Sequence, residues 1–356
     1  MKTILPFIYA IVLFYGCAED KYAIDTLLNA PAGGSIGDTV YIQQNPEWTG
    51  FNHPRAIIVG KEPLLYVADT DNNRIVMLDL FGHVIGYSQR IQRPVGLAED
   101  KKLNLVVCAE FDTTLPGHQG SPTTFGALYR IDLYTALHDI NAAPITRVFY
   151  DPTDSVRRYT GVSMLYNNFY YVTRIGNKNE PERLDKDIAV MVFDTADTYI
   201  SPISNLTPDG TGLRSLDSLT GIATVPTGKS LDFVYCQSGT KSLYKVQWIS
   251  LVAAGQTTFF DSKFNQNVDP TLDILKVNRF ASPAGVTIDA SSNFFVIDAA
   301  KDSLFRFSAS GVEKYSFGGS KQFKQPRGVA FFDKTLYIAD TGNNRIVRFK
   351  LSTDLQ

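Results

Sequence analysis

The feature that most constrains this chain is a pattern that occurs near its beginning and again near its end. In both copies a Pro-Arg pair precedes a small residue, an apolar stretch then ends in Ala-Asp-Thr, and Asn-Asn-Arg-Ile-Val follows. The first copy spans residues 53–76 and the second spans residues 325–347. A repeated unit of strand-like segments cannot bury its apolar faces alone. The pattern therefore predicts an array of similar units packed against one another.

Weaker copies of the unit fill the middle of the chain. The small residue that opens each unit recurs at separations of 40 to 65 residues, and each occurrence is followed by apolar or alternating runs typical of strands. Six openings predict six units. The opening residues are Ala56, Gly96, Gly161, Gly221, Gly285 and Gly328.

In its order and spacing the motif resembles the NHL repeat, whose four-stranded units assemble into β-propellers. The resemblance implies an all-β fold, with a six-bladed β-propeller over residues 38–356. The last unit ends shortly after its third strand, while residues 38–43 form a strand-like segment before the first unit opens. We therefore expect this N-terminal segment to complete the last blade, which would remove the exposed edges and close the ring.

The charge balance bears on the partners of the protein. Its 34 Lys and Arg residues and 36 Asp and Glu residues give a formal net charge of −2. Proteins that bind nucleic acid mainly through phosphates have a clear basic excess, so nucleic acid is not expected as a partner. We expect the protein to be a monomer.

The N-terminal residues are typical of an export signal. Lys2 precedes an apolar run over residues 4–15, which is shorter than the ~20 residues of a membrane-spanning helix. Gly16-Cys17 after this run resembles the lipobox of bacterial lipoproteins. The resemblance implies a signal peptide over residues 1–17, a lipidated Cys17 and a tether over residues 18–37. The alternative is an ordinary secretory signal with an incidental cysteine.

A lipidated Cys17 would place the protein on the bacterial cell envelope, with the lipid anchor as its only membrane contact. Glu19-Asp20 directly after the cysteine favours the outer membrane or cell surface over the inner membrane. The two remaining cysteines, Cys108 and Cys236, lie in apolar strand-like runs. We expect both to be small buried side chains rather than a disulfide.

Arginines at the mouth of the predicted channel are the first candidate site. Arg55 and Arg327 stand directly before the opening residue in the first and last units, which are neighbours in a closed ring. Arg174 begins the insertion of the third unit and is expected on the same rim. Paired guanidinium groups suit a carboxylate, a phosphate or an anionic sugar. The alternative is that Asp69 and Asp340 neutralise Arg55 and Arg327, each within its own blade.

Two long insertions indicate which face of the ring binds a partner. Residues 111–122 in the second unit and 174–187 in the third lengthen the same connection of neighbouring blades, so they should emerge on one face. Long loops on a rigid scaffold often carry function. We predict that this face binds a protein, a glycan or a small anionic ligand. The alternative is that the insertions are neutral surface elaborations.

Whether the protein could be a metal-dependent enzyme depends on its candidate metal ligands. Four acidic residues close equivalent strands and could form a ring around the axis for calcium, although bracing of turns explains them as well. NHL-like propellers include an amidating lyase with a zinc site, and related six-bladed propellers include calcium-dependent lactonases. The four histidines here lack the spacing of a zinc site. We therefore expect a binding module with no catalytic residue and no cofactor that can be named, and keep a metal-dependent lyase or lactonase as the alternative. The four acidic residues are Asp69, Glu110, Asp298 and Asp340.

Overall fold

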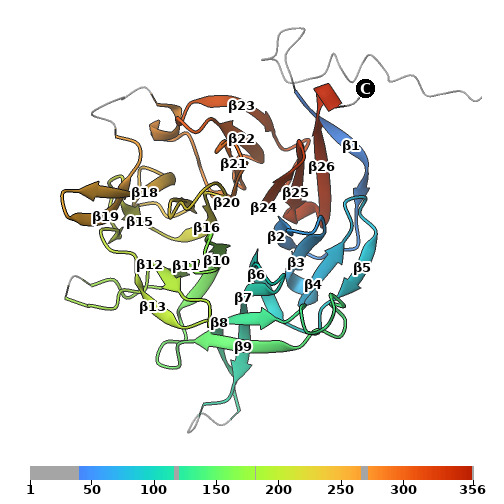
Figure 1. Ribbon diagram of the computed structural model, residues 1–356, viewed down its shortest axis with the longest axis horizontal. Coiled ribbons are helices and arrows are strands. Elements are labelled where there is room, and N and C mark those ends of the chain that lie inside the picture. The colour runs from blue at the N-terminus through green and yellow to red at the C-terminus, as the bar shows by residue number, and fades with distance from the viewer. Residues whose placement is uncertain (1–39, 116–119, 181, 266–271, 355–356) are drawn as a thin grey trace, which may run out of the picture. The chain divides into compact units, whose positions relative to one another are not determined.

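Every sheet of the propeller is a blade of four antiparallel strands. The computed structural model describes residues 40–115, 120–180, 182–265 and 272–354, and it shows six such blades arranged around a central axis (Figure 1). The predicted all-β six-bladed propeller is therefore confirmed. Blades 1 to 3 consist of β2 (Pro54–Val59), β3 (Leu65–Asp69), β4 (Arg74–Leu78) and β5 (Val84–Tyr87); β6 (Gln92–Glu99), β7 (Leu105–Thr113), β8 (Thr123–Ile131) and β9 (Ile145–Tyr150); and β10 (Arg158–Met164), β11 (Tyr170–Ile175), β12 (Ala189–Phe193) and β13 (Tyr199–Pro202).

The second half of the ring follows the same plan. The connection between blades 3 and 4 carries a small parallel pair, β14 (Thr207–Pro208) and β15 (Ser215–Leu216). The helices of the described residues are 3-10 turns of three residues, and none is long or apolar enough to cross a membrane. Blades 4 to 6 consist of β16 (Leu219–Thr224), β17 (Phe233–Gln237), β18 (Val246–Ala254) and β19 (Thr257–Ser262); β20 (Pro283–Ile288), β21 (Phe294–Asp298), β22 (Ser303–Phe307) and β23 (Glu313–Gly318); and β24 (Gly328–Phe332), β25 (Thr335–Asp340), β26 (Arg345–Leu351) and β1 (Tyr41–Trp48).

The ring is closed by the N-terminal strand, as expected. β1 pairs antiparallel with β26, and the blue and dark red strands lie side by side in Figure 1. The strand begins at Tyr41 and extends to Trp48, so it lies a few residues later than the predicted segment 38–43. The predicted signal peptide and tether, residues 1–37, lie outside the described residues.

The hydrophobic core lies between blades. The buried apolar residues form six clusters, and each cluster draws its members from two neighbouring blades. Successive side chains of a strand point to opposite faces of its sheet. Val106 therefore packs toward blade 3, whereas Val107 packs toward blade 1. This two-sided burial explains why the second and third strands are apolar runs rather than alternating ones. Cys108 and Cys236 are buried free thiols, which confirms the prediction for both.

The opening residues are small because the inner strands meet at this level. A Cβ atom added to Gly96 would lie 3.2 Å from the Cα of Gly161, and one added to Gly161 would lie 3.2 Å from the Cα of Gly221. At Gly285 the added atom would lie only 2.4 Å from the backbone oxygen of Arg327. Five glycines and Ala56 thus form a ring, which we call the glycine ring, where each blade's backbone touches the next.

The repeated polar motif links consecutive blades. The Thr70 hydroxyl donates to the Pro94 carbonyl oxygen of blade 2 (2.8 Å). The equivalent Thr341 hydroxyl donates to the Pro54 carbonyl oxygen of blade 1 (2.6 Å), which joins the two ends of the ring. The neighbouring Asn73 has a left-handed backbone, with φ of 56°, a conformation that asparagine tolerates in tight turns. Its side-chain oxygen accepts the Arg93 N–H of blade 2 (3.0 Å).

The glycine ring makes a direct stability prediction. We expect Gly285→Ala to lower the free energy of unfolding by about 1–3 kcal/mol, because overpacked sites that cannot relax cost this much. Gly212→Ala is the matched control, since a Cβ there meets nothing within 4 Å. Urea denaturation of both variants measures the difference. Equal stability of the two variants would contradict the role assigned to the ring.

The closing strand makes a second prediction. A chain that begins at Phe51 lacks β1 and with it the buried side chains of Tyr41 and Trp48. Burial of one large side chain contributes about 1.5–3 kcal/mol, so we expect this truncation to lower the thermal midpoint strongly. A chain that begins at Asp38 retains β1 and serves as the control. The prediction fails if both truncated chains melt at the same temperature in calorimetry.

Candidate functional site at the channel mouth

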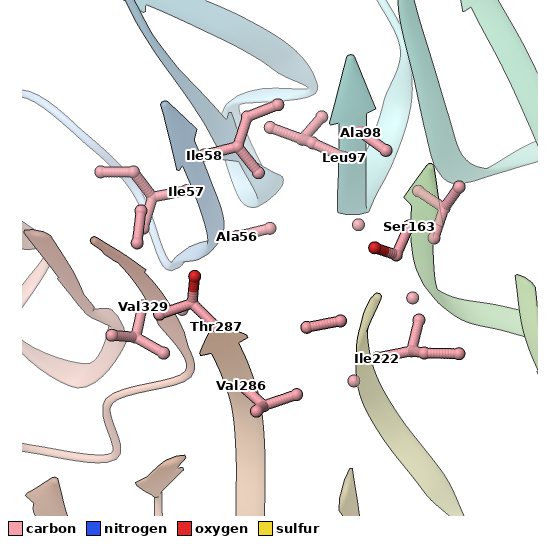
Figure 2. A pocket seen from close by; sticks show the side chains of 18 of the residues that line it. Ala56, Ile57, Ile58, Leu97, Ala98, Ser163, Ile222, Val286, Thr287 and Val329 are labelled. Carbon is pink, nitrogen blue, oxygen red and sulfur yellow. The ribbon is translucent and has the colours of Figure 1, made fainter. Parts of the chain in front are cut away.

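The inner strands of all six blades enclose a cavity along the axis. Its volume is about 350 Å³, within the range of small-molecule sites, and Figure 2 shows its wall. Each inner strand runs in the same direction along the axis, because every blade repeats the same order of strands. One mouth of the channel is therefore formed by the first residues of the inner strands, and the other by their last residues. The wall residues labelled in Figure 2 are Ala56, Ile57, Ile58, Leu97, Ala98, Ser163, Ile222, Val286, Thr287 and Val329.

Arg55 and Arg327 both line this cavity at the first mouth, in the neighbouring blades 1 and 6. Both side chains are partly buried. Among the described residues, no ion pair joins either guanidinium to a carboxylate, and the Nε atom of Arg55 is buried without a hydrogen-bond partner. The two arginines thus line the same mouth, and the alternative partners Asp69 and Asp340 are paired with Arg74 and Arg345 instead.

The surroundings of Arg55 and Arg327 disfavour the charged form of both side chains. Burial lowers the pKa of Arg55, and the positive charges of Arg327 and Arg93 lower this pKa further, against the opposing effect of the Asp71 and Glu110 carboxylates. Burial likewise lowers the pKa of Arg327. A guanidinium nevertheless stays protonated at neutral pH. Two partly buried positive charges therefore lie at one mouth of the cavity, and an anionic ligand would relieve the repulsion between them.

Two further arginines that were not predicted from the sequence, Arg93 and Arg158, lie beside the mouth and share one carboxylate. Arg93 Nε lies 3.5 Å from Glu110 Oε2, and Arg158 Nε lies 3.0 Å from Glu110 Oε1. Arg93 also lies 3.6 Å from a carboxylate oxygen of Asp71. Arg93 and Arg158 each stand three residues before the opening glycine of their blade, and this common position is the sequence feature that could have identified them. Among these side chains, the four arginines thus outnumber the two carboxylates, Glu110 and Asp71.

The four predicted acidic residues do not form an axial ring in the structure, and none of them lines the cavity. Asp69 accepts hydrogen bonds from Arg74 Nε (2.8 Å) and Asn72 Nδ2 (2.8 Å), and Asp340 has the same role with Arg345 and Asn343. Asp298 accepts backbone N–H groups of its own turn and of the preceding segment. Glu110 holds the two rim arginines. Each carboxylate thus has a local structural role.

Arg174 also lies away from the cavity. Its side chain is 3% exposed, and it donates to a carboxylate oxygen of Asp185 (2.7 Å) and to the carbonyl oxygen of Asp187 (3.0 Å). The buried Asp187 carboxylate in turn accepts Arg157 Nε (2.9 Å) and the Lys178 N–H (2.8 Å). Arg174 therefore anchors the insertion of blade 3 and does not extend the pair at the mouth.

Both insertions lie on the face of the arginine mouth. Pro54, at the start of β2, is paired with Asp69 at the end of β3, so connections after the second strand are on the same side as the first mouth. In blade 2 the insertion lengthens β7 and β8 to nine residues each. The Arg147 guanidinium stacks 3.8 Å above the Phe111 ring at the base of this hairpin. The insertions of blades 2 and 3 thus lie on the same face as the arginine mouth.

The candidate metal ligands are dispersed. Within the described ranges, no group of three or more His, Cys, Asp or Glu side chains is placed to hold a metal ion. His53 contacts Asp71 (2.8 Å) and His83 contacts Asp79 (2.8 Å), both at the surface. His118 lies outside the described residues.

Comparison with known proteins supports the fold. The family model of the NHL repeat matches residues 323–349, the last copy of the motif. No curated protein matches the chain in sequence. Among solved structures, the chain is similar to the aldose sugar dehydrogenase of Streptomyces coelicolor in its PQQ-bound form. That structure has 13% identity and a TM-score of 0.58, with 90% of this chain and 100% of that chain covered.

Two further structures show the same fold. A gluconolactonase from Xanthomonas campestris has 12% identity and a TM-score of 0.55, over 89% of this chain and 99% of that one. The virginiamycin B lyase of Staphylococcus aureus has 12% identity and a TM-score of 0.52, over 88% and 100%. At this level of identity the likeness establishes the propeller fold alone.

Proposed function

We propose that the protein is a binding module that receives the anionic group of a ligand between Arg55 and Arg327. The observation that carries the proposal is the pair of partly buried guanidinium groups without ion pairs at one mouth of the cavity. The fully buried arginines of the described chain, Arg157 and Arg174, have carboxylate partners. The partly buried Arg306 and Arg348 also have an Nε atom without a hydrogen-bond partner, but neither lines the cavity. A charge left unpaired in such a place is costly unless a ligand completes it.

The geometry favours a carboxylate, a phosphate or an acidic sugar as the bound group. A guanidinium presents N–H donors in a plane and binds the two oxygens of such groups at once. The apolar wall below the mouth, with Ala56, Ile58 and Val286, suits the uncharged body of the ligand. The insertions of blades 2 and 3 on the same face would contact the rest of a larger partner, such as a protein or a glycan.

The arginine pair is tested by a double substitution. We expect Arg55→Ala with Arg327→Ala to weaken binding of phosphate, citrate or galacturonate at least 10-fold, because both charge-assisted contacts are lost. Isothermal titration calorimetry at low and high salt measures the affinity. A double variant of the exposed Arg214 and Lys229, both to Ala, removes the same charge elsewhere and should bind like the wild type.

Two results would contradict the proposal. One is equal affinity of the wild type and the Arg55, Arg327 double variant for every anion that binds. The other is failure of the wild type to bind any anion of the panel. A thermal midpoint close to that of the wild type confirms that the double variant is folded, so that lost binding reports the site.

We also propose that Cys17 carries a lipid that holds the propeller on the bacterial cell envelope. The support is the sequence alone, with Gly16-Cys17 placed at the end of the apolar run. Wild-type protein expressed with its N-terminus should partition into the detergent phase of a Triton X-114 extraction, and Cys17→Ala should move it to the aqueous phase. Identical partitioning of the two proteins would show that no lipid is attached at Cys17.

A further inference from the structure

The seam between blades 1 and 2 carries an acidic pair that the anion site does not use. Ten side-chain atoms of the described residues are buried without a hydrogen-bond partner, and three of them belong to one neighbourhood. These are Glu62 Oε2, Glu99 Oε1 and His138 Nδ1. Buried polar groups without partners are uncommon, so their gathering at one place requires an explanation.

Each carboxyl group of this pair has one oxygen bonded and one oxygen free. Glu99, the last residue of β6, has a side chain that is 3% exposed, and its Oε2 accepts the backbone N–H of Lys61 (2.6 Å). Glu62 Oε1 accepts the Tyr66 hydroxyl (2.7 Å). The remaining oxygen of each group lacks a donor. Glu99 also lines the axial cavity, with Gly60 and Lys61 beside it, at the mouth opposite to Arg55.

One proton explains both free oxygens. Two ionised carboxylates in one buried site repel each other, whereas a carboxylic acid can donate to a neighbouring carboxylate. Burial, together with the charge and the hydrogen bond of Glu62, raises the pKa of Glu99 to about 8 against the opposing effect of Lys61. The proton belongs to the pair rather than to either residue.

We propose that Glu62 and Glu99 share one proton at neutral pH and act as a proton-responsive latch on the seam between blades 1 and 2. The latch joins the β2–β3 connection of blade 1 to the end of β6 in blade 2. Loss of the proton adds a negative charge at this end of the cavity and sets two carboxylates against each other. The proposal is independent of anion binding at the opposite mouth.

Most of the charged and polar groups around the pair are already engaged with other partners. Lys61 Nζ lies 4.0 Å from Glu99 Oε2, but it donates to the carbonyl oxygens of Glu99 (2.9 Å) and Asp100 (3.0 Å). The Asp100 carboxylate is paired with Arg130 (2.7 Å). His138 Nδ1 is 4.0 Å from Glu62 Oε1, and the Tyr66 hydroxyl already donates to Glu62. Lys61 is thus the one cation that directly faces the pair among these groups.

The sign of the pH dependence follows from the raised pKa. A carboxyl group whose pKa is higher in the folded than in the unfolded chain favours folding at low pH. This contribution is lost as the pH rises from the ordinary value of 4.5 to about 8. The wild type should therefore lose stability over this interval relative to a variant that cannot ionise at Glu99.

The test compares thermal midpoints of the full chain from pH 5 to pH 9. In Glu99→Gln the amide can donate to Glu62 at every pH. We therefore expect the midpoint of this variant minus that of the wild type to increase by roughly 3 °C or more between pH 5 and pH 8. Above pH 8 this difference should stay constant. Glu182→Gln replaces an exposed carboxylate and should show a constant difference. A constant difference for Glu99→Gln as well would overturn the proposal.

A second measurement does not depend on the variant folding. In wild-type protein labelled with carbon-13 at the glutamate carboxyl carbons, NMR should show a resonance that titrates well above pH 6. Glu62→Gln should shift that titration to lower pH, because the neighbouring charge is removed. If all glutamate carboxyl carbons of the wild type titrate below pH 6, the pair holds no proton at neutral pH and the latch does not exist.

Discussion

The close approach of six backbones around one axis is the constraint on which the rest of this structure depends. At the glycine ring, a Cβ on Gly285 would meet the backbone of blade 6 at 2.4 Å, and one on each of the other four glycines would meet its nearest neighbouring atom at 2.9–3.2 Å. Side chains can therefore not fill the axis at this level. The residue before each ring member is fixed at the mouth by the same contact. Arg55 and Arg327 are at the mouth because they precede ring members in adjacent blades.

The same repeat also determines which charges are left over. The Asp at the end of the second strand is needed to hold the following turn, where it binds an Asn and an Arg of its own blade. Asp69 and Asp340 are fully buried in this role, with Arg74 and Arg345 as their partners. They are not available to Arg55 or Arg327. The structural motif and the candidate site are thus built from separate residues, and a substitution at the mouth should leave the turns intact.

The fold could be predicted from the sequence because its signals are local and repeated. The six small residues, the Asp-Thr strand ends and the early strand without a blade were sufficient for blade number and closure. The candidate site was predictable only in part. Arg174 looked equivalent to a rim residue, but its partners Asp185 and Asp187 come from the insertion, whose folding no repeat describes. The contact of Glu62 with Glu99 joins residues of two blades through connections that differ between blades, so no shared motif marks it.

The parallel arrangement of the inner strands gives the channel two chemically different ends. The first residue of every inner strand lies at one mouth and the last residue lies at the other. The arginines and the acidic pair are therefore at opposite ends of the channel. The first mouth has a positive excess from Arg55 and Arg327, whereas Glu62, Glu99 and Lys61 lie at the second. In a cavity with apolar walls, the positive excess at the first mouth is weakly screened. An anionic ligand would therefore be oriented with its charged group toward the insertion-bearing face and its neutral end along the wall.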